Sequence, residues 1–256
     1  MLVNRRDFVV GSAAAGLQGA AVPALFTPEH NVKAIAFDAF AILDPRPVVS
    51  RAQEVFPDRA TELMNLWRTR QFEYTWLRSM MGQYADFWRV TDDALTFAAK
   101  SLKLELTADR RSRLMETYLE LKTWPDALPT LHALKETGHR LAFLSNFTPN
   151  MLYAGIKNAG MEGLFEHVLS TDRVRAYKPS PRAYQMGIDA FRLDRSEILF
   201  VAFAGWDAAG ARRFGYPTFW TNRLHAPTEE LDIAPTAEAT DLNELIRWLR
   251  QAGRAE

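Results

Sequence analysis

The sequence predicts an α/β protein with a doubly wound, Rossmann-like parallel sheet core and an inserted helical cap subdomain. Short, continuously apolar runs indicate buried strands, and amphipathic stretches of helical period lie between them. Residues 48–123 form an exception, because they carry helical patterns alone. Strands that alternate with helices form parallel sheets covered on both faces, so the purely helical block is expected to stand apart from the sheet.

Composition narrows the class of protein. The 256 residues are 48% hydrophobic and 24% charged, which is ordinary for a soluble globular protein and excludes a disordered chain, a collagen-like fibre or a multi-spanning membrane protein. Lys and Arg total 31, as do Asp and Glu, so no charge excess indicates a nucleic-acid partner. The sequence has no cysteine, which excludes disulfides and thiolate catalysis.

Residues 1–24 have the features of an export signal. Arg5 and Arg6 precede an apolar stretch that carries no charge until Glu29, with small residues around Pro23. This arrangement resembles a twin-arginine signal. The stretch is rich in glycine, which weakens a helix, and it is too weakly apolar for a stable membrane anchor. We therefore expect export to the periplasm and exclude this segment from the fold.

The first strand is expected at residues 32–37, directly before Asp38. Three amphipathic helices are expected next, with Thr91 and Thr107 as N-caps, at residues 60–81, 84–101 and 108–123. We assign residues 31–47 and 124–256 to the α/β core and residues 48–123 to the helical cap.

Strands and helices alternate again after residue 124. Strands are expected at residues 140–144, 167–170, 198–203 and 217–220. Helices are expected at 128–137, after Thr148-Pro149, after Ser180-Pro181, from Asp207 onward, and at 242–249. Proline at the first helical position supports the two starts that follow Thr148 and Ser180.

Polar side chains follow the expected strands. Asp38, Asp207 and the pair Ser145 and Asn146 come directly after strands, and Lys178 lies in the loop after another. Each alone is typical of a turn or a helix cap. Parallel sheets bind ligands beyond the carboxyl ends of their strands, so four such groups at four strand ends favour a site.

Carboxylates must carry the chemistry of this site. The sequence has no serine-hydrolase elbow outside residues 1–24, no zinc-protease motif and no phosphate loop, and its five histidines stand apart from the strand ends. An aspartate can act as a nucleophile that forms an ester. A nearby lysine favours its charged form, and a second aspartate can activate the water that cleaves the ester.

Four motifs carry a family resemblance: Phe-Asp-Ala-Phe at 37–40, Leu-Ser-Asn at 144–146, Tyr-Lys-Pro at 177–179 and Trp-Asp at 206–207. In this order they resemble the motifs of the haloacid dehalogenase superfamily. The helical block carries Leu-Trp-Arg at 66–68 and Glu-Tyr-Thr-Trp-Leu-Arg-Ser at 73–79, which is similar to the cap of the type II, or L-2-haloacid, dehalogenases.

The resemblance implies hydrolysis of short (S)-2-haloacids to (R)-2-hydroxyacids through an aspartyl ester, with a haloacid and water as partners and no metal or organic cofactor. It makes Asp38 the nucleophile, Lys178 the cation that keeps Asp38 ionised, and Asp207 the residue that serves the water. Arg68 and Asn146 become the halide-binding pair. A homodimer is also expected, because related enzymes are commonly dimers and the cap carries aromatic residues that look exposed, such as Trp76 and Trp88.

Further residues receive supporting roles from the same resemblance. Ser145 would contact the substrate carboxylate, and Tyr184 matches a position that supports the site. An apolar wall would be formed by Phe40, Phe72, Phe87 and Trp206. The alternative for Arg68 is a solvated charge on a helix, and the alternative for Phe72 and Phe87 is plain core of the cap.

The sequence departs from the magnesium-dependent phosphatases of the superfamily at two places. These enzymes carry a second aspartate where this chain has Phe40, and paired acids in the last motif, where Asp207 stands alone. A hard divalent cation would lack oxygen ligands there, so a metal-dependent phosphatase ranks behind a dehalogenase.

The sequence also departs from the dehalogenases themselves. Ile42 and Phe40 replace residues with hydroxyl groups, Ala202 and Ala204 replace a serine and an asparagine, and Phe147 replaces a glycine. Losing a hydrogen bond to a charged group costs about 1.5–3 kcal/mol. The changes leave three functions open: a dehalogenase with a drier, reshaped pocket, a hydrolase of the same fold for another ester or phosphate, or a catalytically impaired binder of small carboxylates.

Overall fold

The computed structural model describes residues 32–252, and the signal-like residues 1–24 lie outside this range. A parallel sheet forms the centre, with its strands in the order β3-β2-β1-β4-β5-β6. The strands are β1 (Ala34–Phe37), β2 (Arg140–Ser145), β3 (His167–Ser170), β4 (Ile198–Ala202), β5 (Thr218–Thr221) and β6 (Ala237–Ala239). The predicted doubly wound α/β fold is confirmed.

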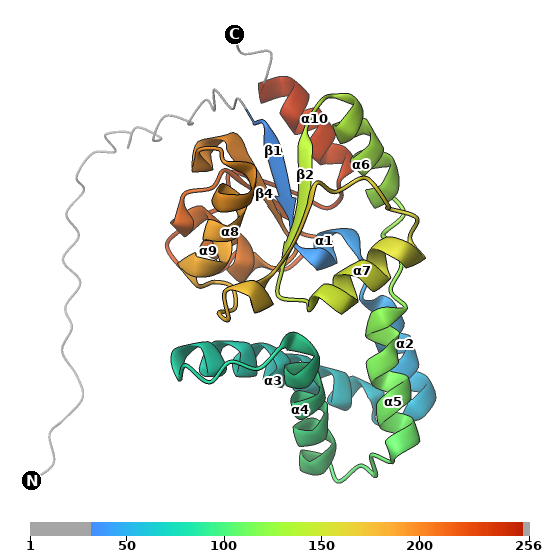
Figure 1. The fold of residues 1–256 in the computed structure, drawn as a ribbon. Helices are drawn as coiled ribbons and strands as arrows, with labels where there is room; N and C mark the ends of the chain where they lie inside the picture. The colour runs from blue at the N-terminus through green and yellow to red at the C-terminus, as the bar shows by residue number, and fades with distance from the viewer. Residues whose placement is uncertain (1–31, 253–256) are drawn as a thin grey trace, which may run out of the picture.

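Helices cover both faces of the sheet (Figure 1). One face packs against α6 (Ala127–Glu136), α7 (Pro149–Asn158) and α10 (Asn243–Ala252), and the other against α8 (Pro181–Phe191) and α9 (Gly205–Phe214). The side chains of β1 point alternately to the two faces of the sheet. Ile35 and Phe37 pack in the core on the first face, and Ala34 and Ala36 pack in the core on the second. Burial on both faces explains the continuous apolar runs of the sequence.

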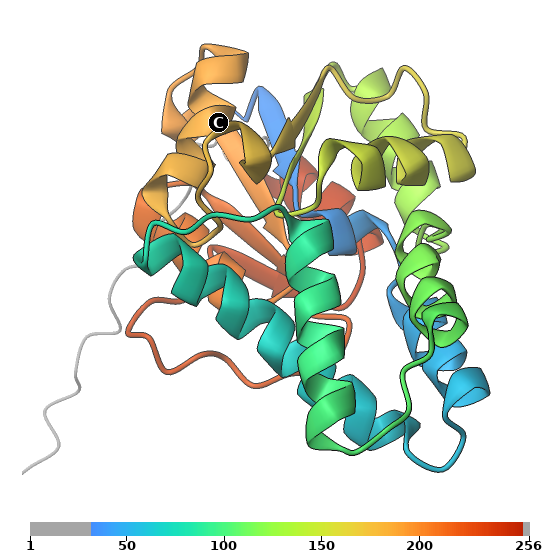
Figure 2. The same cartoon turned by 60° about the horizontal axis from the view of Figure 1, so that its bottom comes forward.

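The helical block lies across the carboxyl ends of the strands (Figures 1 and 2). It consists of α2 (Arg46–Val55), α3 (Ala60–Met80), α4 (Phe87–Ser101), α5 (Ala108–Glu116) and the 3₁₀ turn η1 (Thr117–Leu119). The indole N–H of Trp67 on α3 donates to the carbonyl of Thr91 on α4 at 2.8 Å and fixes this pair of helices. We call this block the cap.

The two segments that connect the cap to the core lie side by side. Leu43 and Thr123 form an antiparallel bridge, and the N–H of Asp44 donates to the carbonyl of Lys122 at 2.8 Å. The entry comes from α1 (Ala39–Ile42), a single turn that follows β1. The two linkers therefore hold the cap over the sheet edge at one place.

Some helix boundaries differ from the sequence prediction. Asp86 caps α4, whereas Thr91 lies inside that helix and its hydroxyl donates to the carbonyl of Phe87 at 2.6 Å. Thr107 and Thr148 cap α5 and α7 as predicted. The α9 helix begins at Gly205, so Asp207 lies within its first turn instead of opening it, and Ser180 makes no capping hydrogen bond through its side chain.

No helix in residues 32–252 is both long and apolar enough to cross a membrane.

Candidate active site

A buried lysine joins two carboxylates at the edge of the sheet beneath the cap. The ammonium nitrogen Nζ of Lys178 lies 2.7 Å from Oδ1 of Asp38 and 2.5 Å from Oδ2 of Asp207. The Lys178 side chain is 1% exposed, so water does not screen these contacts. Asp38 and Lys178 lie on the chain after β1 and β3, and Asp207 in the first turn of α9 after β4, so the parallel sheet places all three beyond the same edge.

The carboxylate of Asp38 is held by the start of α1. Asp38 is the N-cap of this turn, and its Oδ2 accepts a hydrogen bond from the N–H of Phe40 at 3.0 Å. Its own N–H donates to the carbonyl of Val201 on β4 at 2.9 Å. Both oxygens of Asp38 are thus oriented, and its side chain is 13% exposed toward the pocket.

Tyr184 fixes the second carboxylate. Its hydroxyl donates to Oδ1 of Asp207 at 2.7 Å, while Lys178 holds Oδ2. The hydroxyl reaches this position because α8 and α9 pack closely at Gly210, where an added Cβ would lie 2.7 Å from the tyrosine oxygen. A larger residue at Gly210 would therefore push Tyr184 away from Asp207.

Burial and the ion pairs set the protonation of these groups. Burial raises the pKa of Asp207 to about 6, although Lys178 opposes the rise. Burial also opposes the charge of Lys178, but Asp207 and Asp38 outweigh it and raise the pKa of the lysine. Burial and the neighbouring carboxylate raise the pKa of Tyr184 well above its ordinary value, so this hydroxyl remains a hydrogen-bond donor.

Arg68 brings a free positive charge to the pocket from α3. It has no hydrogen bond or ion pair to any residue of the described range. Its guanidinium carbon lies 5.5 Å from the ring centre of Phe40 and 5.4 Å from that of Phe72. Burial lowers the pKa of Arg68 from its ordinary value. Arg68 therefore lines the pocket instead of the outer surface, and its unpaired positive charge suits an anion.

Ser145 and Asn146 are buried at the end of β2. Oγ of Ser145 accepts a hydrogen bond from the N–H of Phe147 at 3.1 Å. Oδ1 of Asn146 accepts one from the backbone N–H of Lys178 at 3.1 Å, which ties the two loops together. The side-chain N–H groups of Asn146 have no partner among the described residues, although the side chain lines the pocket. They remain free to meet a ligand.

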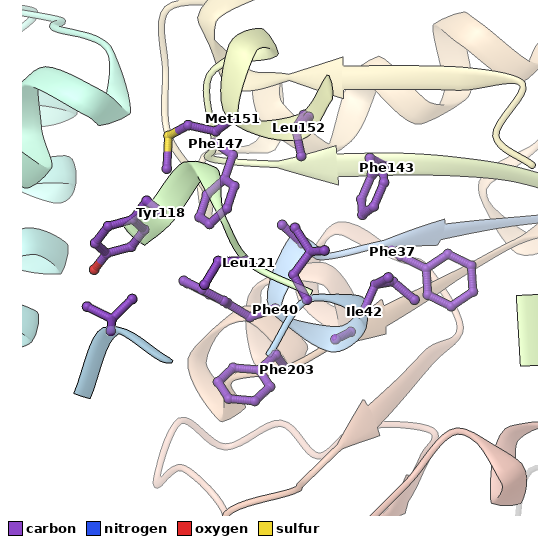
Figure 3. Packing of buried hydrophobic residues seen from close by; sticks show 14 of the residues in the cluster. Phe37, Phe40, Ile42, Tyr118, Leu121, Phe143, Phe147, Met151, Leu152 and Phe203 are labelled. Atoms are coloured by element: carbon purple, nitrogen blue, oxygen red, sulfur yellow. The ribbon is translucent and has the colours of Figure 1, made fainter. Parts of the chain in front are cut away.

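Aromatic rings close the pocket. Phe147 packs edge-on against Phe40 with ring centres 5.0 Å apart and stacks on Phe87 at 5.4 Å. Phe203 lies 5.8 Å from Phe40 on the other side (Figure 3). Phe72 and Trp206 complete the wall. The remaining cavity measures about 20 Å³, which is room for about one water molecule.

All eleven residues expected at the site lie in or beside this pocket. Phe87 is buried against Phe147, so it belongs to the core between cap and sheet as well as to the pocket. Sequence reasoning did not place Phe147 and Phe203 in the wall. The available signal was the bulky residue at 147, directly after the Ser-Asn pair.

The donor set does not fit a divalent cation. The ring of Phe40 stands where a second carboxylate would be needed to bind the cation. Ala204, three residues before Asp207, has no oxygen atom in its side chain that could act as a ligand. Within residues 32–252, no group of three or more His, Asp or Glu side chains is arranged to hold a metal ion.

Taken together, an aspartate at the end of the first strand, its lysine partner and a helical cap define a capped hydrolase in which a carboxylate attacks the substrate. Residues 27–215 match the family of haloacid dehalogenase-like hydrolases. The chain belongs to this family.

Individual relatives agree with the family match. The (S)-2-haloacid dehalogenase of Pseudomonas sp. (strain YL) is 44% identical over 227 residues, which cover 88% of this chain and 98% of the relative. A crystal structure of an L-2-haloacid dehalogenase matches with a TM-score of 0.84 at 43% identity, covering 86% of this chain and 99% of the other. The enzyme of Xanthobacter autotrophicus with chloropropionic acid covalently bound matches with a TM-score of 0.79 at 32% identity, covering 86% and 98%.

Proposed function

We propose that this protein is a hydrolytic dehalogenase that converts short (S)-2-haloacids to (R)-2-hydroxyacids. The observation that carries the proposal is the carboxylate of Asp38, paired with buried Lys178 and facing the unpaired Arg68 across a small apolar pocket. The similarity to (S)-2-haloacid dehalogenases over most of the chain supports the same substrate class.

The first step forms an ester. A carboxylate oxygen of Asp38 attacks C2 of the haloacid from the side opposite the halogen, and the carbon–halogen bond breaks with inversion at C2. The halide leaves with the bonding electron pair. Arg68 and the free amide N–H groups of Asn146 are placed to stabilise this charge. Ser145, the last residue of β2, precedes Asn146 and is available for the substrate carboxylate.

The second step cleaves the ester. Asp207 accepts a proton from a water molecule whose oxygen attacks the carboxyl carbon of Asp38. The bond between this carbon and the substrate oxygen breaks, and the hydroxyacid takes up the proton that Asp207 had accepted. The second proton of the water is released to solvent, which restores Asp38 as a carboxylate. Lys178 contacts both aspartates throughout and balances their charge.

The direct test is halide release from (S)- and (R)-2-chloropropionate by the purified protein without residues 1–24, with and without EDTA. We expect release from the (S) form alone, unaffected by EDTA. Asp38→Asn should abolish it, whereas the exposed control Asp58→Asn should retain it. Unchanged release by Asp38→Asn would exclude the ester mechanism.

Two other outcomes would favour the functions left open by the sequence. Magnesium-stimulated turnover of p-nitrophenyl phosphate would indicate a hydrolase for another substrate. Thermal stabilisation by a small carboxylate without any turnover would indicate a binder. The observation that favours a binder is the presence of Ala202 and Ala204 in place of the polar residues of the dehalogenases.

We also propose that the protein is exported to the periplasm by the signal-like residues 1–24. The paired Arg5 and Arg6 before an uncharged stretch support this proposal. Replacing both arginines with lysine should leave the protein in the cytoplasm. Continued export of this variant in cell fractionation would contradict a twin-arginine signal.

A homodimer is proposed as the solution state. The aromatic residues expected on the cap surface, Trp76 and Trp88, are half-buried, so they do not form an exposed face. Exposed apolar side chains on the cap helices α2 and α3, among them Val49 and Leu77 with 51% and 43% exposure, support an interface. Light scattering at micromolar concentration should give twice the chain mass, and a monomer mass would contradict the proposal.

A further inference from the structure

A second and much larger cavity lies beside the catalytic pocket, between the cap and the core. It measures about 1000 Å³ and is partly open to solvent. Its apolar walls come from the end of α3, from α9 and its surroundings, and from the loop between β5 and β6: Trp76, Met80, Pro179, Trp206, Phe214, Leu231 and Ile233. We call this cavity the side cleft.

The side cleft and the catalytic pocket share one wall. Trp206 lines both cavities, directly before the catalytic-site residue Asp207. Its indole ring contacts Phe72 of the catalytic pocket with ring centres 5.5 Å apart, and Trp76 of the side cleft at the same distance. A change in the side-chain conformation of Trp206 would therefore join the two spaces.

The lining of the side cleft suits an apolar ligand. Met80 and Leu231 are 76% and 56% exposed, so two of the large apolar side chains that line the side cleft face water. The charged lining residues Arg213 and Asp232 are exposed and of opposite sign, which gives the cleft no charge excess. Covering the apolar walls would release water from them, and this is the main source of affinity for hydrocarbon groups.

The two cavities differ in what they can hold. About 20 Å³ in the catalytic pocket leaves no room for a long group on C2 of a substrate. Such a substrate must keep its carboxylate and halogen near Asp38 and Arg68, so its hydrocarbon chain has to leave through a wall. The wall formed by Phe72 and Trp206 has the side cleft behind it.

We propose that the side cleft is a subsite for the hydrocarbon chain on C2 of long-chain (S)-2-haloacids, which enters when the ring of Trp206 turns aside. This inference rests on the proposed dehalogenase function and specifies its substrate range. Each methylene that the cleft removes from water should raise kcat/KM about fourfold, which corresponds to about 0.8 kcal/mol.

Halide release from (S)-2-bromopropionate, (S)-2-bromohexanoate and (S)-2-bromooctanoate tests the subsite with two matched pairs of variants. Leu231→Asp and Met80→Ser change residues that line the side cleft. Leu224→Asp and Met81→Ser change residues that do not line it, with 63% and 59% exposure.

The wild-type protein should show kcat/KM rising from bromopropionate to bromooctanoate. Leu231→Asp and Met80→Ser should lower kcat/KM for bromooctanoate at least about tenfold and leave bromopropionate unchanged. The two control variants should leave both values unchanged. A wild-type kcat/KM that falls with chain length, or cleft variants that behave like their controls, would overturn the subsite.

Failure of the dehalogenase function has a different signature. It would appear as no halide from bromopropionate either, and a binding measurement then decides on the side cleft alone. Octanoate, which carries no halogen, should quench the tryptophan fluorescence of the wild-type protein and of Leu224→Asp, and should bind Leu231→Asp at least about tenfold more weakly. Equal binding by all three proteins would overturn the subsite whatever the protein catalyses.

Discussion

Nζ of Lys178 lies 2.7 Å from Oδ1 of Asp38, although the two residues are 140 positions apart in the sequence. The contact exists because all strands of the sheet are parallel, so the chain after β3 and the chain after β1 begin at the same edge, although β2 lies between these strands. The hydrogen bond from the N–H of Lys178 to Oδ1 of Asn146, at the end of β2, directs the loop toward Asp38. A buried ammonium group next to a carboxylate keeps that carboxylate charged, which is the state in which it can attack carbon.

Replacing this lysine should separate its role in charge from its role in packing. Lys178→Met keeps the length of the side chain but leaves Asp38 and Asp207 without their shared cation. Halide release should fall at least about hundredfold. The free energy of unfolding at pH 8 should fall by about 3–5 kcal/mol, because two buried carboxylates lose their partner. Lys122→Met, at an exposed lysine, should change neither quantity.

The stability loss of Lys178→Met should itself depend on pH. The pKa of Asp207 is already raised to about 6 in the wild-type protein, and removing the lysine can only raise it further. The folded variant then takes up a proton at a higher pH than the unfolded chain, whose aspartates titrate near 3.9. Its free energy of unfolding should therefore recover relative to wild type as the pH falls from about 8 toward about 6, below which Asp207 is protonated in both folded proteins. A constant difference across this range would contradict the proposed burial of charge.

The acid limb of the pH–rate profile should reflect the protonation of the Asp207 carboxylate. Below about pH 6 this residue is protonated and cannot accept a proton from water, so kcat should fall about tenfold per pH unit. Tyr184→Phe removes the hydrogen bond that stabilises the charged carboxylate, and should move the limb up by about one pH unit. Tyr216→Phe is the control, since its hydroxyl donates to the backbone carbonyl of Tyr184 at 2.6 Å and not to Asp207. Identical limbs in all three proteins would exclude Asp207 as the titrating group.

Arg68 should be required for activity and dispensable for folding. It is desolvated and has no ion-pair partner in residues 32–252, so Arg68→Met removes an uncompensated charge from an apolar wall. Its Tm should equal or exceed that of wild type, while halide release falls at least about hundredfold. Arg70 is the matched control, because it pairs with Glu73 at 2.6 Å on the same helix. Arg70→Met should keep its activity and lose less than about 1 kcal/mol of stability. A marked loss of stability in Arg68→Met would indicate a structural role instead.

The fold was largely predictable because its signals are local. The strands of the central sheet are buried on both faces, so they stand out as continuous apolar runs. The Ala237–Ala239 strand escaped prediction because three residues with a central glutamate carry no such run. The Arg46–Val55 helix was missed as well, although Pro47 at its start is a recognisable helix signal.

The positions of the site residues were predictable where the topology of the sheet alone determines them. Asp38, Lys178 and Asp207 each follow a strand, and a parallel sheet brings such positions together whatever the details of packing. The direction of a ring is not a local property. Phe147 and Phe203 turn toward Phe40 because cap and sheet close around them, and no pattern in the chain records this contact.

Phe147 should decide whether the altered motifs reshape the pocket or merely impair it. Phe147→Ala removes a ring that is 1% exposed and packs on Phe40 and Phe87, so the free energy of unfolding should fall by about 3–5 kcal/mol. Tyr153→Ala, at a ring that is 59% exposed, should cost less than about 0.5 kcal/mol. If Phe147 limits the space beside Arg68, its loss should raise kcat/KM for (S)-2-iodopropionate relative to (S)-2-chloropropionate, because the larger halogen gains more from the added volume. An unchanged ratio, with both substrates turned over more slowly, would mean that the ring supports the position of Phe40 and Asp38 and does not set the size of the halogen site.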